Sequence, residues 1–120
     1  MRQMSKMLTL ILVLIGTMSP AGEFLTTTTG YCNEGARGCR ICCGKWAKYN
    51  RTASRSRPDA SRTCAAPHWV PFGTRVWIEG IGWRVVEDRL NRKYEGRWEV
   101  FFATHKEAKK FGKRKLEVRL

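Results

Sequence analysis

Short stretches that alternate between polar and apolar residues fill the second half of this chain, and they limit what it can fold into. Residues 74–78 (TRVWI) alternate charged or polar side chains with apolar ones, and so do residues 115–120 (KLEVRL). Such alternation turns one face of a strand toward a core and the other toward solvent. Glycines and a proline separate the stretches, which favours turns between them. The pattern predicts a mainly β domain with strands at 74–78, 83–88, 97–102 and 115–120.

Three further segments complete the expected domain. Residues 25–29 (LTTTT) are rich in β-branched side chains and predict an opening strand. Thr104 and Glu107 form a capping-box pattern that Gly112 closes, which predicts a helix of about two turns. Residues 45–62 have little periodicity, which is typical of a long loop.

Residues 1–21 have the layout of a secretory signal peptide. Basic residues precede an uninterrupted apolar run at 7–16, and small residues follow at 19–21. The run is shorter than the roughly 20 residues that a membrane span needs. An uncleaved signal anchor through residues 7–18 is the alternative. We therefore expect a secreted, periplasmic or cell-envelope-associated protein whose folded domain spans residues 22–120.

The chain is strongly basic, with 23 Lys and Arg against 10 Asp and Glu in 120 residues. This length suits one domain. Without the two basic residues of the signal segment the net charge is still +11. Such a charge attracts polyanions, of which anionic wall polymers and membrane surfaces fit an exported protein better than nucleic acid does. The charge is spread along the chain, so it marks no site, and the oligomeric state stays open.

Five cysteines predict cross-links in an exported chain of this size. Their odd number leaves at least one thiol free or paired between molecules. Ligand-like spacing within the cluster keeps a metal site open as the alternative. We favour disulfides over a metal site and expect no cofactor, and the sequence does not fix the connectivity. The candidates are Cys32, Cys39, Cys42, Cys43 and Cys64.

Four segments between residues 64 and 120 occur in the order and spacing of a known family. Residues 66–74 (APHWVPFGT) resemble a stretch in which an Asp-Pro pair precedes a proline and a Gly-Thr. Residues 86–88 (VED) and 97–101 (RWEVF) resemble two strands that carry further aspartates. Residues 104–114 (THKEAKKFGKR) resemble a closing helix with Ala and Phe-Gly before basic residues. Together they resemble the three-aspartate (3D) domain of peptidoglycan-cleaving lytic transglycosylases.

This resemblance implies a six-stranded double-psi β-barrel with one short C-terminal helix. The fold is shared with the catalytic domain of membrane-bound lytic transglycosylase A and is similar to that of expansins. The expected domain then has a Cys-rich half at 30–64 and a motif-bearing half at 64–120. Ala66 stands where the family has its first aspartate, Asp88 keeps the second, and Glu99 replaces the third.

The resemblance assigns acid/base work to Glu99. We expect Asp88 to be its partner, which either tunes Glu99 or stabilises positive charge at the sugar ring. A lytic transglycosylase needs only one carboxyl that first protonates the glycosidic oxygen and then accepts a proton from the attacking sugar hydroxyl. Burial should raise the pKa of that carboxyl. Thr74, Trp69 and Trp98 are candidates for substrate contact. The structural alternatives are an exposed Glu99 that pairs with an arginine, a Thr74 that starts a strand, and tryptophans that fill the core.

Three functions are compatible with these patterns. The first is an exported enzyme that cuts the bond between N-acetylmuramic acid and N-acetylglucosamine in peptidoglycan. The second is a non-catalytic, expansin-like module that binds the cell wall. The third is a basic β-barrel that binds nucleic acid or lipid, which only the charge supports.

Overall fold

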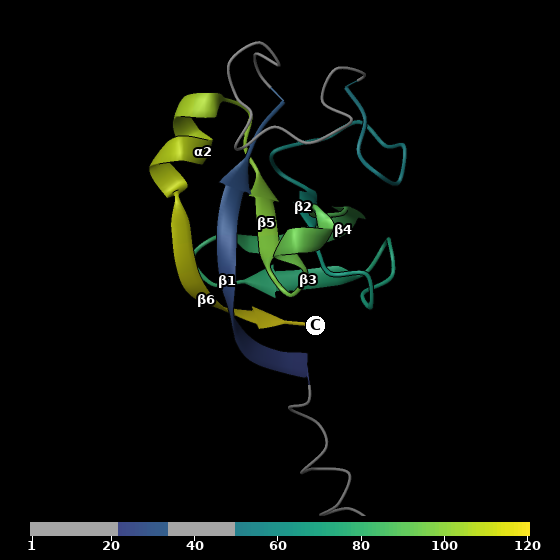
Figure 1. The fold of residues 1–120 in the computed structure, drawn as a ribbon, viewed down its shortest axis with the longest axis vertical. Helices are drawn as coiled ribbons and strands as arrows, with labels where there is room; N and C mark the ends of the chain where they lie inside the picture. The colour runs from purple at the N-terminus through teal and green to yellow at the C-terminus, as the bar shows by residue number, and fades with distance from the viewer. Residues whose placement is uncertain (1–21, 34–49) are drawn as a thin grey trace, which may run out of the picture.

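A closed barrel of six strands makes up the domain, and one short α-helix lies beside it (Figure 1). The computed structural model describes residues 22–33 and 50–120. The strands are β1 (Glu23–Tyr31), β2 (Thr63–Ala65), β3 (Arg75–Ile78), β4 (Gly82–Asp88), β5 (Trp98–Phe101) and β6 (Lys113–Arg119), the α-helix is α2 (His105–Phe111), and a 3-10 turn, η3 (Arg92–Tyr94), joins β4 to β5.

The strands follow one another around the barrel in the order β1-β5-β2-β4-β3-β6. The pairs β1/β5 and β2/β4 are parallel, and all other neighbours are antiparallel. This order places β2 between β4 and β5. β4, which ends at Asp88, and β5, which contains Glu99, are therefore separated by one strand.

The prediction of a mainly β fold with six strands in a closed barrel and one short helix is confirmed. Five strands and the helix lie within about two residues of the predicted positions. β2 was not predicted, because its three residues are all buried and show no alternation. The signal segment at 1–21 and the cysteines at 39, 42 and 43 lie outside the described residues. Within residues 22–33 and 50–120, no helix has the length and apolar character that crossing a membrane requires.

Inward-facing residues of all six strands fill the barrel. Trp98 is the largest of them and is completely buried. Phe24 extends the core toward one end of the barrel, with its ring centroid 6.1 Å from that of Trp98. The alternation within β5 is clear, because Trp98 and Val100 lie in the core while Glu99 between them is only partly buried. Other fully buried core residues include Cys64, Ala66, Val70, Val76, Ile78, Val86 and Val118.

Helix α2 is capped at both ends as the sequence predicts. The Thr104 hydroxyl accepts a hydrogen bond from the backbone N–H of Glu107 and donates one to its carboxylate. Gly112 ends the helix with a φ of 64°, a conformation that favours glycine. Ala108 and Phe111 form the buried face, and the helix packs against β1.

Gly30 permits this close packing between α2 and β1. A Cβ atom there would lie 2.7 Å from the Ala108 carbonyl oxygen and 3.0 Å from the Phe102 ring. We expect Gly30→Ala to destabilise the domain by roughly 1–3 kcal/mol, because backbone cannot yield as a flexible side chain does. Urea unfolding measures the change. A variant as stable as wild type, or more stable, would contradict this close approach of the helix to the strand. The substitution would then act only by lowering the conformational entropy of the unfolded chain.

Candidate active site

Asp88 and Glu99 lie on either side of one small residue, Ala65. In the antiparallel pair of β2 and β5, Ala65 is opposite Glu99. In the parallel pair of β2 and β4, Ala65 is opposite Asp88. Residues in register across a sheet project from the same face, so the two carboxyl side chains flank the methyl group of Ala65. Because Trp98 and Val100 point into the core, this face is the outer one.

A β-bulge brings Asp88 to this face. Cys64 is in register with Val86, but the next residue, Ala65, is in register with Asp88. The extra residue, Glu87, shifts the alternation of β4 by one. Without the bulge, Asp88 would share the inward face of Val86. With it, Asp88 projects beside Ala65 and Glu99.

Three donors hold the carboxyl group of Asp88. The Tyr31 hydroxyl donates to Oδ2 at 2.8 Å. The backbone N–H groups of Ala53 and Arg89 both donate to Oδ1 at 2.9 Å. Tyr31 itself is buried and packs edge-on against Phe101 at a ring-centroid distance of 5.4 Å. The position of Asp88 is thus fixed from β1, from the 50–62 loop and from the backbone of the next residue, Arg89.

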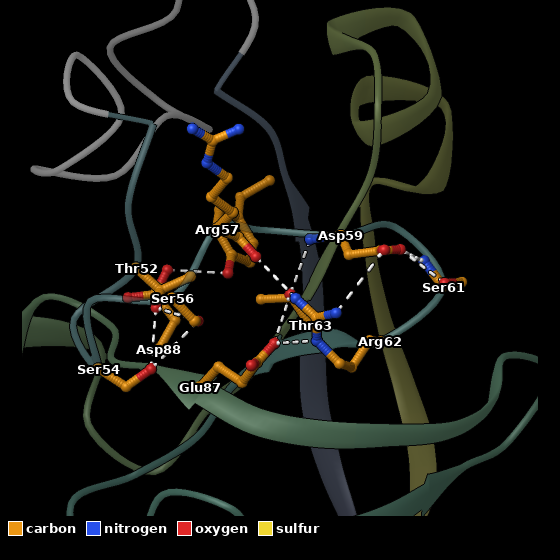
Figure 2. A network of polar contacts seen from close by, with 11 residues as sticks. Thr52, Ser54, Ser56, Arg57, Asp59, Ser61, Arg62, Thr63, Glu87 and Asp88 are labelled. Carbon is orange, nitrogen blue, oxygen red and sulfur yellow. Dashed lines mark hydrogen bonds and ion pairs between the residues drawn. The ribbon is translucent and has the colours of Figure 1, made fainter.

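The 50–62 loop is tied to the bulge by a polar network (Figure 2). The Ser54 N–H donates to the Glu87 carbonyl at 3.0 Å. The Glu87 carboxylate accepts hydrogen bonds from Arg62 at 2.9 Å and from the Thr63 hydroxyl at 2.7 Å. Thr52, Ser54 and Ser56 join their hydroxyl groups within the loop. The loop is therefore part of the site, because it positions the Ala53 N–H that donates to Asp88.

Glu99 has the opposite environment. Its carboxyl group takes part in no hydrogen bond or ion pair with any residue that the structure describes. Burial, together with the negative charge of Asp88, raises the pKa of Glu99 from 4.5 to about 8, and the charge of Arg97 opposes this only in part. Glu99 therefore keeps its proton at neutral pH.

The two acids titrate in a fixed order. Burial also raises the pKa of Asp88, but its three hydrogen bonds and the nearby Arg89 favour the ionised form and limit the rise. The pKa of Glu99 is raised by the charge of Asp88, which requires that Asp88 lose its proton first. A carboxyl group whose hydrogen bonds favour ionisation thus lies near one whose pKa is strongly raised, a separation of roles that acid/base sites use.

Tyr31→Phe tests how Asp88 is held. The substitution removes one hydrogen bond that stabilises the ionised carboxylate and leaves the ring against Phe101. We expect the pKa of Asp88 to rise further, with the fold unchanged. Carbon-detected NMR of the carboxyl groups over a pH series measures it, and an unchanged Asp88 titration would show that the hydroxyl does not bond to this group in solution.

Two of the predicted substrate contacts have structural roles in the described residues. The Thr74 hydroxyl donates to the Pro71 carbonyl at 2.7 Å, within the turn that precedes β3. Trp98 lies in the core, and its indole N–H has no partner there. Neither side chain presents a free polar group next to the acids.

Trp69 has a surface position. It is 62% exposed and packs against Phe24 with a ring-centroid distance of 6.0 Å. The residues before and after Trp69, His68 and Val70, are both held by hydrogen bonds. His68 bonds to both carboxylate oxygens of Glu95 through its backbone and its ring, and Arg89 donates to the Val70 carbonyl at 2.7 Å. Trp69 is therefore a fixed, exposed aromatic face near one end of the barrel.

Cys64 has a free thiol in the structure. The cysteines at 39, 42 and 43 lie outside the described residues, so the disulfides stay a prediction. Cys64 is completely buried because the register of β2 directs it inward between Val86 and Val100. Burial raises the pKa of the Cys64 thiol to about 12. Cys32 lies with its Sγ atom 3.9 Å from Nδ1 of His105. In the described ranges, 22–33 and 50–120, no three His, Cys, Asp or Glu side chains gather to hold a metal ion.

Tyr31 and the Ala53 N–H were not predicted as parts of the site. A single tyrosine at the end of a strand gives no motif, and a backbone donor leaves no sequence signal. Only the alternation of Thr29 and Tyr31 along β1 could have placed Tyr31 on the outer face.

No protein-family model matches the chain, and no curated protein matches it. The site has to be interpreted from its own geometry.

Proposed function

We propose that this protein cleaves the glycan strands of peptidoglycan without water, as a lytic transglycosylase in which Glu99 is the acid and base. The observation that carries the proposal is the pair of unlike carboxyl groups across Ala65. Glu99 has no bonding partner among the described residues and has a pKa raised to about 8, whereas Asp88 accepts three hydrogen bonds that favour its ionised form. A protonated acid at neutral pH is what cleavage of a glycosidic bond requires.

The reaction would proceed in two proton transfers. Glu99 donates its proton to the oxygen that links N-acetylmuramic acid to N-acetylglucosamine, and the bond from C1 to that oxygen breaks. The Glu99 carboxylate then accepts the proton of the C6 hydroxyl of the muramic acid residue. The C6 oxygen bonds to C1 and closes a 1,6-anhydro ring, and Glu99 regains its original state.

Asp88 would support both steps without itself transferring a proton. Its negative charge raises the pKa of Glu99, which keeps the acid loaded. The same charge stabilises the positive charge that develops at C1 in the transition state. Tyr31 acts through Asp88, because its hydroxyl bonds only to that carboxylate in the described part of the chain. It is a positioning residue.

We propose in addition that the barrel has the double-psi topology. A six-stranded barrel with two parallel pairs is compatible with a double-psi topology, and the motifs at 66–74, 86–88, 97–101 and 104–114 resemble those of 3D domains. We propose that the chain is a divergent member of this group that works outside the cytoplasm. The replacements at Ala66 and Glu99 leave Asp88 and Glu99 as the working carboxyl pair.

Mass spectrometry of soluble products tests the proposal. Purified peptidoglycan is incubated with the protein, and the released fragments are compared with those of a blank. We expect 1,6-anhydro ends on the muramic acid residues. Reducing ends in their place would mean hydrolysis, with a water activated at the same acids. Release of neither product would reject the enzyme.

A non-catalytic wall-binding module is the second candidate, and Trp69 favours it. Sugar rings stack on exposed aromatic faces, and Trp69 is fixed in an exposed position. Ala66 also removes the carboxyl that the resembling family has at that place. Protein that sediments with peptidoglycan but releases no fragments, and that loses this binding on Trp69→Ala, would establish the binding module instead.

A further inference from the structure

The row of residues that contains the two acids continues across β1 to β6. Thr29 in β1 is in register with Glu99 on one side and with Lys113 on the other. The outer face therefore carries Lys113, Thr29, Glu99, Ala65 and Asp88 side by side on five neighbouring strands, which Figure 1 shows in the order β6, β1, β5, β2, β4. The acids occupy one end of this row and a cation the other.

A second lysine extends the cationic end. Lys115 is in register with Thr27, two residues along β1 from Thr29, and so projects from the same face as Lys113. Both lysines are exposed, and neither has an ion pair with a described residue. Nearby Glu117 does not neutralise them, because Arg119 pairs with it at 3.2 Å. The lysines thus form an uncompensated positive pair beside the outer surface of β1.

We propose that Lys113 and Lys115 bind the peptide stem of the glycan through its free carboxylates, so that the site selects strands that still carry peptides. This inference rests on the proposed function and names the part of the substrate that the β6 side recognises. The stem hangs from the muramic acid residue whose bond Glu99 would cleave. A substrate with its sugar at Glu99 therefore has a negatively charged branch close to the reacting bond.

The distances suit such a branch. Lys113 lies two strands from Glu99, so their Cα atoms are about 10 Å apart. A stem of two extended residues spans about 7 Å beyond its point of attachment, and a lysine side chain reaches several ångströms to meet it. Thr29 between them is partly exposed and offers a hydroxyl group to the intervening amides. Charge complementarity then favours carboxylate over an uncharged sugar.

Binding to two matched ligands tests the inference. Soluble glycan strands with intact stems are compared with strands from which an amidase has removed the stems, using Glu99→Gln protein so that neither is cleaved. We expect about 10-fold tighter binding of the stem-bearing strands by calorimetry. The double variant Lys113→Gln, Lys115→Gln in the same background should bind both strands equally.

A control separates a specific contact from general charge. Lys109→Gln with Lys110→Gln removes the same charge from exposed residues of α2 and should keep the preference. Equal binding of the two strands by the starting protein, or equal loss in the control, would overturn the inference. So would displacement of stem-bearing strands by a phosphate polymer at lower concentration than by free stem peptide. Failure of wild type to release anhydro products is a separate result, which rejects the proposed chemistry and leaves this binding comparison to be judged alone.

Discussion

Glu99→Gln is expected to lower the release of anhydro-muropeptides by at least about 100-fold, because the amide can neither donate the first proton nor accept the second. Glutamine has nearly the same shape and removes no described hydrogen bond. The loss should therefore appear in kcat while binding of the glycan persists. Rates of product release, measured by mass spectrometry at several substrate concentrations, separate the two.

Two control variants test whether a loss of activity comes from the carboxylic acid of Glu99 itself. Glu107→Gln, on α2, makes the same Glu-to-Gln replacement away from the two acids and keeps an acceptor in the capping box, so its activity should equal that of wild type. Glu99→Asp restores a carboxylic acid on a shorter side chain and should recover part of the activity. If Glu99→Gln retains most of the activity, Glu99 is not the acid.

A second large effect is expected on stability. The folded protein holds a proton on Glu99 up to about pH 8, whereas the unfolded chain loses it near pH 4.5. Between these values the folded state binds more protons, so the free energy of unfolding falls as the pH rises. The contribution of Glu99 is about 1.4 kcal/mol per pH unit, on the order of 5 kcal/mol across the window.

Urea unfolding of wild type and Glu99→Gln at a series of pH values measures this contribution as a difference. The wild type should lose stability relative to the variant from about pH 5 upward, and the difference should level off above pH 8. Other titrating groups affect both proteins alike and cancel. Parallel stability curves would mean that Glu99 is ionised in the folded protein, as an exposed glutamate is.

Alternating apolar residues made most strands predictable. Thr74 to Ile78 and Lys115 to Leu120 each have one face for the core and one for solvent, and the structure has β3 and β6 there. β2 escaped prediction because Thr63, Cys64 and Ala65 are buried on both sides between β4 and β5. A short strand in the middle of a sheet has no solvent face, so it carries no period of two.

The candidate site was predictable in its residues but not in its arrangement. The resemblance pointed to Asp88 and Glu99, yet alternation alone would place Asp88 inward with Val86. Only the bulge at Glu87 brings the two carboxyl groups to one face, and its position depends on pairing with β2. Tyr31 and the Ala53 N–H reach Asp88 from segments 57 and 35 residues away in sequence, contacts that no local pattern encodes.

The inward position of Cys64 could not be predicted from the sequence either. Composition and export favour disulfides, but the register of β2 decides where its side chain points. Cys64 points inward among valines, where a free cysteine packs as a small apolar side chain. A cysteine at this position therefore does not need a cross-link to explain it.

A pH titration of the side-chain carboxyl carbons by NMR tests the central claim most directly, because it observes the protons of Glu99 and Asp88 separately. We predict that Asp88 loses its proton first and that Glu99 follows with a pKa of about 8, which falls in Asp88→Asn as the neighbouring charge is removed. A Glu99 titration near 4.5, unchanged by Asp88→Asn, would contradict the account, because the site would then hold two ordinary carboxylates and no acid at neutral pH.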